Sequence, residues 1–118
     1  MVAPTTGPSY VPDRGDVVWL QYGPNVGHEQ AGHRPALVVS QRAYNGPSGL
    51  ALFCPLTTQI KGYPFEVVLP DGGKATGAVL VDQIRNFDWR VRQVRKFDEV
   101  TDATMDDVLA KIGVLVGR

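Results

Sequence analysis

The chain has 118 residues, as many acidic as basic side chains, and 43% hydrophobic residues. These values are typical of one globular domain with its own core, and no apolar run reaches the ~20 residues of a membrane helix. Cys54 is the only cysteine, which excludes an intrachain disulfide and favours a reducing, cytoplasmic location.

The first nine residues are rich in Pro and Thr and have no apolar h-region, so we expect a disordered leader over 1–9 rather than a signal peptide. A single domain is expected over 10–118. Its first hundred residues show short β-type runs separated by turn residues. We predict strands at 16–20, 36–40, 50–54, 65–69, 77–81 and 89–97, with a turn at 45–49. Short strands at this spacing indicate a small barrel or a sandwich.

The C-terminal segment changes period. Its apolar residues fall on one face of a helix: Met105, Val108, Leu109, Ile112, Leu115 and Val116. Thr101 is a suitable N-cap, and Asp102, Asp106 and Asp107 place negative charge where the helix dipole favours it. The predicted fold class is therefore mainly β with a C-terminal α-helix.

A polar loop, residues 27–35 (GHEQAGHRP), precedes the second predicted strand. It brings a carboxylate, two imidazoles and a guanidinium to the start of an apolar run. Pro35 favours an extended conformation at Arg34, which places this arginine at the loop–strand junction. Binding and catalysis concentrate in such loops, although a solvated surface loop has the same composition. His28 and His33 lack the spacing and the further ligands of a zinc site, so we expect neither metal nor cofactor.

Three further polar segments stand out. Residues 57–64 (TTQIKGYP) offer hydroxyls, an amide, a lysine and an aromatic ring that suit a phosphate and a base, or else form a polar hairpin loop. Asp82 and Gln83 follow the fifth predicted strand. Residues 84–97 carry five basic side chains against Asp88 alone, interleaved with Phe87 and Trp89. That pattern suits phosphate contact and base stacking, but we favour a solvated strand face.

Together these blocks resemble the MazF/PemK toxins of toxin–antitoxin modules. The resemblance runs in order from about Tyr10 to the C-terminal helix, through residues 15–19, 29–36, 55–59, 61–67, 82–83 and 111–112. It implies a homodimer of SH3-like small barrels of the MazF/PemK/CcdB type that cleaves single-stranded RNA at short sequences without metal. It also implies inhibition by a cognate MazE-like antitoxin.

Carried over position by position, the resemblance implies that Arg34 and Thr57 are the catalytic pair, supported by Glu29 and His33. It further implies that bases or phosphates are contacted by Gln30, Asn45, Thr58, Gln59, Lys61 and Gln83.

Cleavage of RNA without metal uses the ribose 2′-OH as the nucleophile and leaves a 2′,3′-cyclic phosphate and a 5′-OH. Glu29 is the best candidate for the base, and Arg34 suits electrostatic stabilisation of the phosphorane better than proton donation, because its pKa exceeds ~12. His33 is a candidate acid, and Thr57 can donate a hydrogen bond to a non-bridging oxygen. The alternatives are a CcdB-like toxin that acts by binding a protein target and a general SH3-like binding module. Arg34 and Thr57 favour the nuclease.

Overall fold

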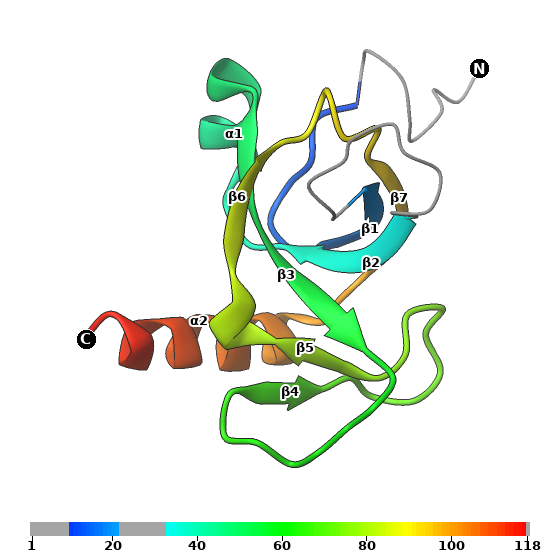
Figure 1. Cartoon of the computed structure of the whole chain (residues 1–118), viewed down its shortest axis with the longest axis vertical. Coiled ribbons are helices and arrows are strands. Elements are labelled where there is room, and N and C mark those ends of the chain that lie inside the picture. The colour runs from blue at the N-terminus through cyan, green and yellow to red at the C-terminus, as the bar shows by residue number, and fades with distance from the viewer. Residues whose placement is uncertain (1–9, 22–32, 118) are drawn as a thin grey trace.

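The structure is a computed structural model and describes residues 10–21 and 33–117. The described strands are β1 (Asp16–Gln21), β2 (His33–Val38), β3 (Leu50–Thr57), β4 (Glu66–Val68), β5 (Ala78–Leu80), β6 (Arg85–Asp88) and β7 (Arg95–Glu99). The described helices are α1 (Arg42–Ser48), the short 3-10 helix η2 (Val81–Gln83) and α2 (Asp102–Leu115) (Figure 1). Within the described residues, no helix is long and apolar enough to cross a membrane.

All strand pairs are antiparallel, and the main path through the sheet is β4-β5-β3-β2-β1-β7. The long strand β3 lies at the centre of the sheet and pairs with three other strands. One edge of β3 pairs with β2, while the other edge is shared between β6, opposite Leu50–Phe53, and β5, opposite Leu56 and Thr57. The end of β3 at Thr57 is therefore flanked by β2 on one side and β5 on the other.

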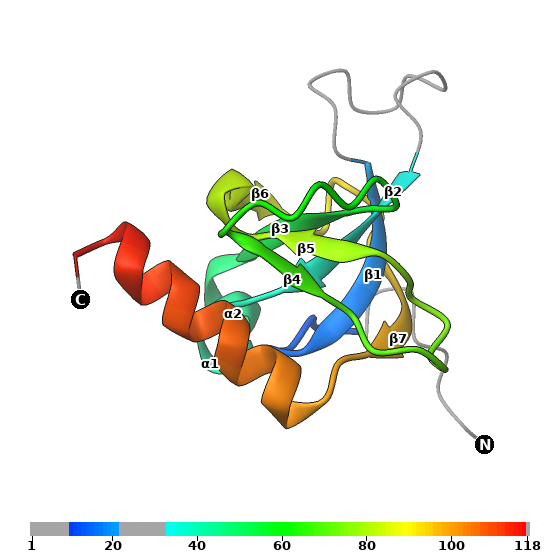
Figure 2. The ribbon, with the colours of Figure 1, turned by 90° about the horizontal axis from the view of Figure 1, so that it is seen from below.

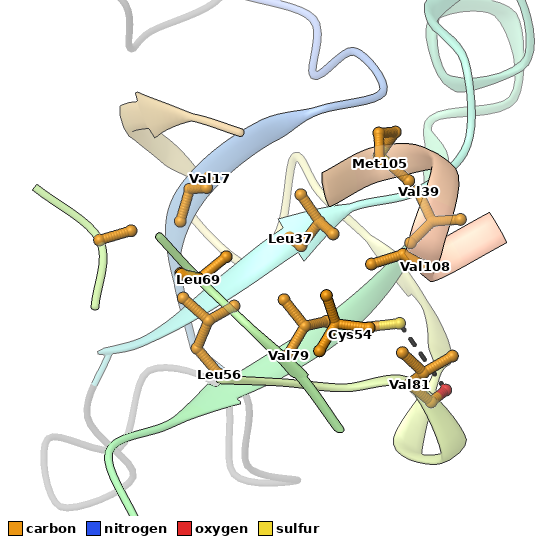
Figure 3. Packing of buried hydrophobic residues seen from close by; sticks show 12 residues of the cluster. Val17, Leu37, Val39, Cys54, Leu56, Leu69, Val79, Val81, Met105 and Val108 are labelled. Atoms are coloured by element: carbon orange, nitrogen blue, oxygen red, sulfur yellow. Dashed lines mark hydrogen bonds between the residues drawn. The ribbon is translucent and has the colours of Figure 1, made fainter. Parts of the chain in front are cut away.

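Helix α2 lies on one side of the curved sheet and contacts η2 and β4 (Figure 2). The core on this face joins Val17, Leu37 and Cys54 from the central strands to Met105 and Val108 of α2 (Figure 3). Cys54 is fully buried there, and burial raises the pKa of its thiol to about 12. Cys54 is thus a buried core residue.

The opposite face of the sheet is also buried. Val18, Leu20, Ala36, Val38, Ala51 and Phe53 pack against Phe87, Trp89 and Val94 from β6 and the turn that follows it. Because both faces of β1, β2 and β3 are covered, these strands show nearly continuous apolar runs rather than strict alternation. The predicted mainly β fold with a C-terminal helix is confirmed.

Helix α2 begins as predicted. The Thr101 hydroxyl accepts a hydrogen bond from the Thr104 N–H at 3.2 Å. Met105 and Val108 are buried, whereas the last residues of the predicted apolar face, Leu115 and Val116, are 41% and 68% exposed.

Several predicted boundaries differ from the structure, and three of the differences change the fold or the site. Residues 42–48 form α1, with Pro47 inside it, and the turn is confined to Gly49, which has a φ of 72°. The predicted strand over 89–97 is instead a turn followed by β7, because the Asp88 carboxylate accepts hydrogen bonds from two N–H groups of that turn. Strand β2 begins at His33, so Arg34 lies inside the strand; the β2–β3 register begins at Ala36, so Pro35 removes no bond from it.

Candidate active site

The ends of β2 and β3 and the segment before β5 surround a surface hollow of about 400 Å³. Its lining consists of Arg34, Pro35, Leu56, Thr57, Thr58, Gln59 and Thr76. Ala36 pairs with Pro55, and continuing that antiparallel register brings Arg34 opposite Thr57. The structure therefore brings the two residues of the predicted catalytic pair together, although they are 23 positions apart in the sequence.

Arg34 reaches the hollow from β2, and pairing with β1 fixes its backbone on that side. It pairs with Leu20 of β1, and its side chain is exposed. Successive strand residues point to opposite faces, so Arg34 and His33 diverge. His33 is exposed and does not line the hollow. A planar guanidinium held in this way suits bidentate contact with phosphate oxygens.

Thr57 is the last residue of β3 and is half-buried. Its hydroxyl oxygen accepts a hydrogen bond from the Gln59 N–H at 3.1 Å. That bond occupies a lone pair and fixes the position of the oxygen, while the hydroxyl proton can still be donated. Thr57 is thus placed as a donor toward an anion in the hollow.

The segment before β5 completes the wall, and the sequence analysis missed it. Gly77 has a φ of 98°, and a Cβ on Gly77 would lie only 2.0 Å from the Thr57 carbonyl oxygen. Glycine is therefore required for this close approach. The approach brings the exposed Thr76 to the wall of the hollow. The signal in the sequence is Gly77 itself, which opens the predicted strand over 77–81 shortly after a Gly-rich turn.

The loop after β3 carries the predicted binding residues Thr58, Gln59 and Lys61. All three are exposed, and the first two line the hollow. Lys61 does not line it, and its ammonium nitrogen lies 5.9 Å from the ring centroid of Tyr63, which is 60% exposed. The Glu66 carboxylate accepts hydrogen bonds from the N–H groups of residues 61 and 62, which shapes the loop.

Asn45 has a different role from the predicted one. It is fully buried in α1, its side-chain amide donates to the Pro12 and Ser40 carbonyls at 2.8 and 2.9 Å, and its side-chain oxygen accepts from the Ser40 hydroxyl at 2.6 Å. The Trp89 indole N–H also donates to its main-chain carbonyl. An expected base contact by Asn45 does not fit this burial, and we leave it out of the proposed site.

The structure places one of the remaining predicted residues, Gln83, and does not describe the others. Gln83 is exposed in η2 and does not line the hollow. Glu29 and Gln30, together with His28 and the predicted leader, lie outside the described residues. Their predicted roles stay predictions.

A second hollow of about 440 Å³ lies between α1 and the start of α2. Acidic and basic side chains alternate around it, with Arg42 3.7 Å from Asp13 and the Arg14 Nε donating to the Val39 carbonyl at 2.7 Å. None of the catalytic or RNA-binding residues predicted from the sequence lines this second hollow. Mixed charge and internal pairing favour a structural role, so the hollow at Arg34 and Thr57 is the candidate site.

Comparison with known proteins defines the class to which this fold and site belong. The sequence model of the family described as "PemK-like, MazF-like toxin of type II toxin-antitoxin system" matches residues 13–116. The chain belongs to this family.

Particular relatives are close in sequence and structure. The chain is 48% identical over 108 residues to the endoribonuclease toxin MazF of Escherichia coli K12, covering 92% of this chain and 96% of that protein. It is 33% identical over 100 residues to the endoribonuclease EndoA of Bacillus subtilis, covering 80% and 85%. A crystal structure of MazF from Deinococcus radiodurans superimposes with a TM-score of 0.84 at 48% identity, covering 93% of this chain and all of the other.

Proposed function

We propose that the chain is the endoribonuclease toxin of a type II toxin–antitoxin module, which cleaves single-stranded mRNA at short sequences without metal. One observation carries the proposal. In a member of this toxin family, Arg34 near the start of β2 and Thr57 at the end of β3 line the same open hollow. Relatives that cover nearly the whole chain are named as endoribonucleases, which supports the same activity here.

The proposed chemistry is attack of the ribose 2′-OH on the adjacent phosphorus, with departure of the 5′ oxygen. Charge builds up on the non-bridging oxygens as the phosphorane forms. Arg34 stabilises that charge through two parallel N–H donors, and Thr57 donates a third hydrogen bond from its fixed hydroxyl. The products are a 2′,3′-cyclic phosphate and a 5′-OH.

Proton transfer is assigned to residues of the polar loop. Glu29 is proposed as the base for the 2′-OH and His33 as the acid for the leaving oxygen. Thr58 and Gln59 are proposed to contact nucleotides in the hollow, with Lys61, Gln83 and Gln30 contacting the RNA beyond it. Thr76 joins them because it lines the same hollow.

Assembly and inhibition follow the same family pattern. We propose a homodimer in the cytoplasm that is neutralised by a MazE-like antitoxin. Solved relatives include a MazE–MazF complex from Deinococcus radiodurans, which superimposes with a TM-score of 0.82 at 45% identity. The antitoxin is expected to place an acidic, partly disordered segment across the RNA-binding hollow, because that hollow attracts anions.

The test is incubation of the purified protein with a defined RNA in excess EDTA, followed by analysis of the new ends. Cleavage that persists in EDTA and leaves 2′,3′-cyclic phosphate ends is expected. A matched RNA with 2′-H at the cleavage site should remain intact. Cleavage that stops on chelation and returns with magnesium would contradict the mechanism. Growth arrest without RNA cleavage would favour the CcdB-like alternative.

A further inference from the structure

The loop between β4 and β5, residues 70–77, contributes Thr76 to the candidate site and is held from outside that site. We call these residues the wall loop. Its ends are closed by a main-chain hydrogen bond, since the Leu69 N–H donates to the Gly77 carbonyl at 2.9 Å. Thr76 itself is exposed, so its place in the wall depends on the residues on either side of it.

Both neighbours of Thr76 are fixed. On one side, Gly77 lies so close to the Thr57 carbonyl that only glycine fits. On the other side, Ala75 is 6% exposed, belongs to the core shared with α2, and donates its N–H to the Asp98 carboxylate at 2.7 Å. A residue held between two such contacts meets a ligand from one position, which lowers the entropic cost of binding.

Asp98 reaches the wall loop from β7. It pairs with Val17 of β1, whose side chain lies in the same core, and paired residues of antiparallel strands point to the same face. On that face, the wall loop lies beside β7 (Figure 2). The Glu99 N–H donates to the other oxygen of Asp98 at 2.8 Å. The position of Ala75 is therefore set by a carboxylate whose own orientation is fixed.

The Asp98 contact matters because the wall loop is not closely packed along its length. Residues 71–74 are exposed. A hollow of about 150 Å³ separates the loop from residues 98–101, and on the side of the loop it is lined by Leu69, Pro70, Asp71, Gly73 and Ala75. Without the bond to Asp98, the wall loop has room to shift, and Thr76 shifts with it.

The hollow at Arg34, Thr57 and Thr76 has room for more than a phosphate. Its volume of about 400 Å³ falls within the ~300–1,000 Å³ of small-molecule sites. If Arg34 and Thr57 hold the scissile phosphate, the adjoining nucleotide lies next to Thr76. A threonine hydroxyl both donates and accepts, so it matches polar groups on the edge of an unstacked base. Phosphate contacts carry no sequence information, whereas a contact to a base edge does.

We propose that Asp98 is a positioning residue for substrate choice: through the Ala75 N–H, it holds Thr76 where the threonine hydroxyl contacts the base next to the scissile phosphate. This inference rests on the proposed function and extends it from the reaction to the choice of RNA. Asp98 does not line the hollow, so it acts through Thr76 and not on the reacting atoms.

The test measures base preference. The cleavage site is first mapped on a long RNA, and kcat/KM is then measured for short RNAs that carry each base in turn on either side of that site. The preference at a position is the ratio of kcat/KM for the best and the worst base. In Asp98→Ala, this ratio should fall about three- to tenfold at one of the two positions, which corresponds to one hydrogen bond. Partial unfolding lowers every kcat/KM value by the same factor and leaves the ratio unchanged.

A double-mutant cycle shows whether Asp98 acts through Thr76. Thr76→Val keeps the shape of the side chain, removes the hydroxyl, and should lower the same ratio at the same position. Thr76→Val/Asp98→Ala should lower it no further than Thr76→Val does. Asp98→Asn keeps an oxygen that can accept from the Ala75 N–H, so it should restore part of the preference. Asp71→Ala removes an exposed carboxylate from the wall loop itself and should leave the ratio unchanged.

Amide hydrogen exchange gives a second readout that does not depend on activity. The Ala75 N–H should exchange faster in Asp98→Ala than in the parent protein, because the bond that protects it is gone. In Asp71→Ala it should exchange at the parental rate.

Three outcomes would overturn the inference and leave the proposed function standing. The first is parental base preference in an Asp98→Ala protein that cleaves RNA. The second is a double variant that shows the product of the two single effects, and the third is an equal loss of preference in Asp71→Ala. If thermal unfolding shows that Asp98→Ala is not folded, parental preference in both Asp98→Asn and Thr76→Val overturns the inference instead. Absence of RNA cleavage by the parent protein contradicts the proposed function, and the inference fails with it.

Discussion

Arg34 of β2 and Thr57 of β3 line the hollow from two neighbouring strands, and we expect each side chain to make a different contact with the phosphate. Arg34 offers charge and a planar pair of donors, whereas Thr57 offers one hydroxyl fixed by the Gln59 N–H. Arg34→Lys keeps the charge and loses the planar donors. Single-turnover cleavage should therefore fall by ~10²–10³, while affinity for the 2′-deoxy analogue stays within a few-fold. Rapid-quench assays at saturating enzyme measure the rate. If Arg34→Ala cleaves at the parental rate, this hollow is not the active site.

Asn45 supports the fold rather than the reaction. Asn45→Ala removes the hydrogen bonds made by its side chain and leaves the Pro12 carbonyl and the Ser40 hydroxyl without this partner in a buried place. The free energy of unfolding should fall by about 1–3 kcal/mol. Urea unfolding followed by tryptophan fluorescence measures it. Asp107→Ala, at an exposed position of α2, serves as the control. An Asn45→Ala protein as stable as the parent would contradict this role.

The location of some site residues can be predicted from the sequence, whereas that of others depends on contacts between distant segments. Arg34 and Thr57 stand in motifs that resemble one family, so their pairing was predictable. Thr76 stands in no such motif, and it reaches the hollow only because Gly77 allows close approach to β3. Asn45 looked like a surface turn residue, since Gly46 and Pro47 follow it. Its burial depends on the Pro12 carbonyl and the Trp89 indole, which are distant in the sequence.

At the level of elements, the segment between β4 and β5 is held to the strand before α2 by one carboxylate. Asp98 accepts a hydrogen bond from the Ala75 N–H at 2.7 Å. Burial acts to raise the pKa of Asp98, but the backbone N–H donors of Ala75, Glu99 and Lys74 outweigh it, so the pKa is lowered. The ionised carboxylate thus fixes the segment that carries Thr76 and Gly77.

A lowered pKa in the folded state means that the stabilisation is complete above the ordinary value of ~3.9 and is lost as the pH falls through the folded value. We therefore expect the stability of the parent protein to fall below about pH 4 more steeply than that of Asp98→Asn. Urea midpoints between neutral and acidic pH measure this. Asp71→Asn, an exposed position in the same segment, is the control. Parallel pH profiles for the parent and Asp98→Asn would contradict the assignment.

The elements that were predicted correctly are those with a strong local signal. Helix α2 has an apolar period and a capping threonine, and the central strands have continuous apolar runs. Helix α1 was missed because Gly46 and Pro47 favour a turn locally, whereas the buried contacts of Asn45 hold the helix. Strand β6 was not predicted, and the turn after it was predicted as part of a strand over 89–97, because that turn depends on the Asp88 side chain folding back onto the N–H groups of residues 90 and 91.

At the scale of the whole molecule, exposed apolar side chains favour association with a second copy of the chain. At the end of α2, Val114 and Val116 are 66% and 68% exposed, and Val68 of β4 is 57% exposed. Such surface favours association. We expect about twice the chain mass at micromolar concentration, measured by light scattering coupled to gel filtration. Val114→Asp should shift the mass toward the monomer. A parent protein that is strictly monomeric and still cleaves RNA at full rate would contradict the dimer.

The order of the strands also sets the moment at which the protein can first fold during its own synthesis. β1 pairs with β2, which follows it closely, but its other edge pairs with β7, where Asp16 lies opposite Glu99. A growing chain therefore keeps one edge of β1 open until residue 99 has left the ribosome, and the core on one face of the sheet stays incomplete until α2 follows. The nascent chain therefore does not complete the toxin fold while most of its own mRNA is still being translated.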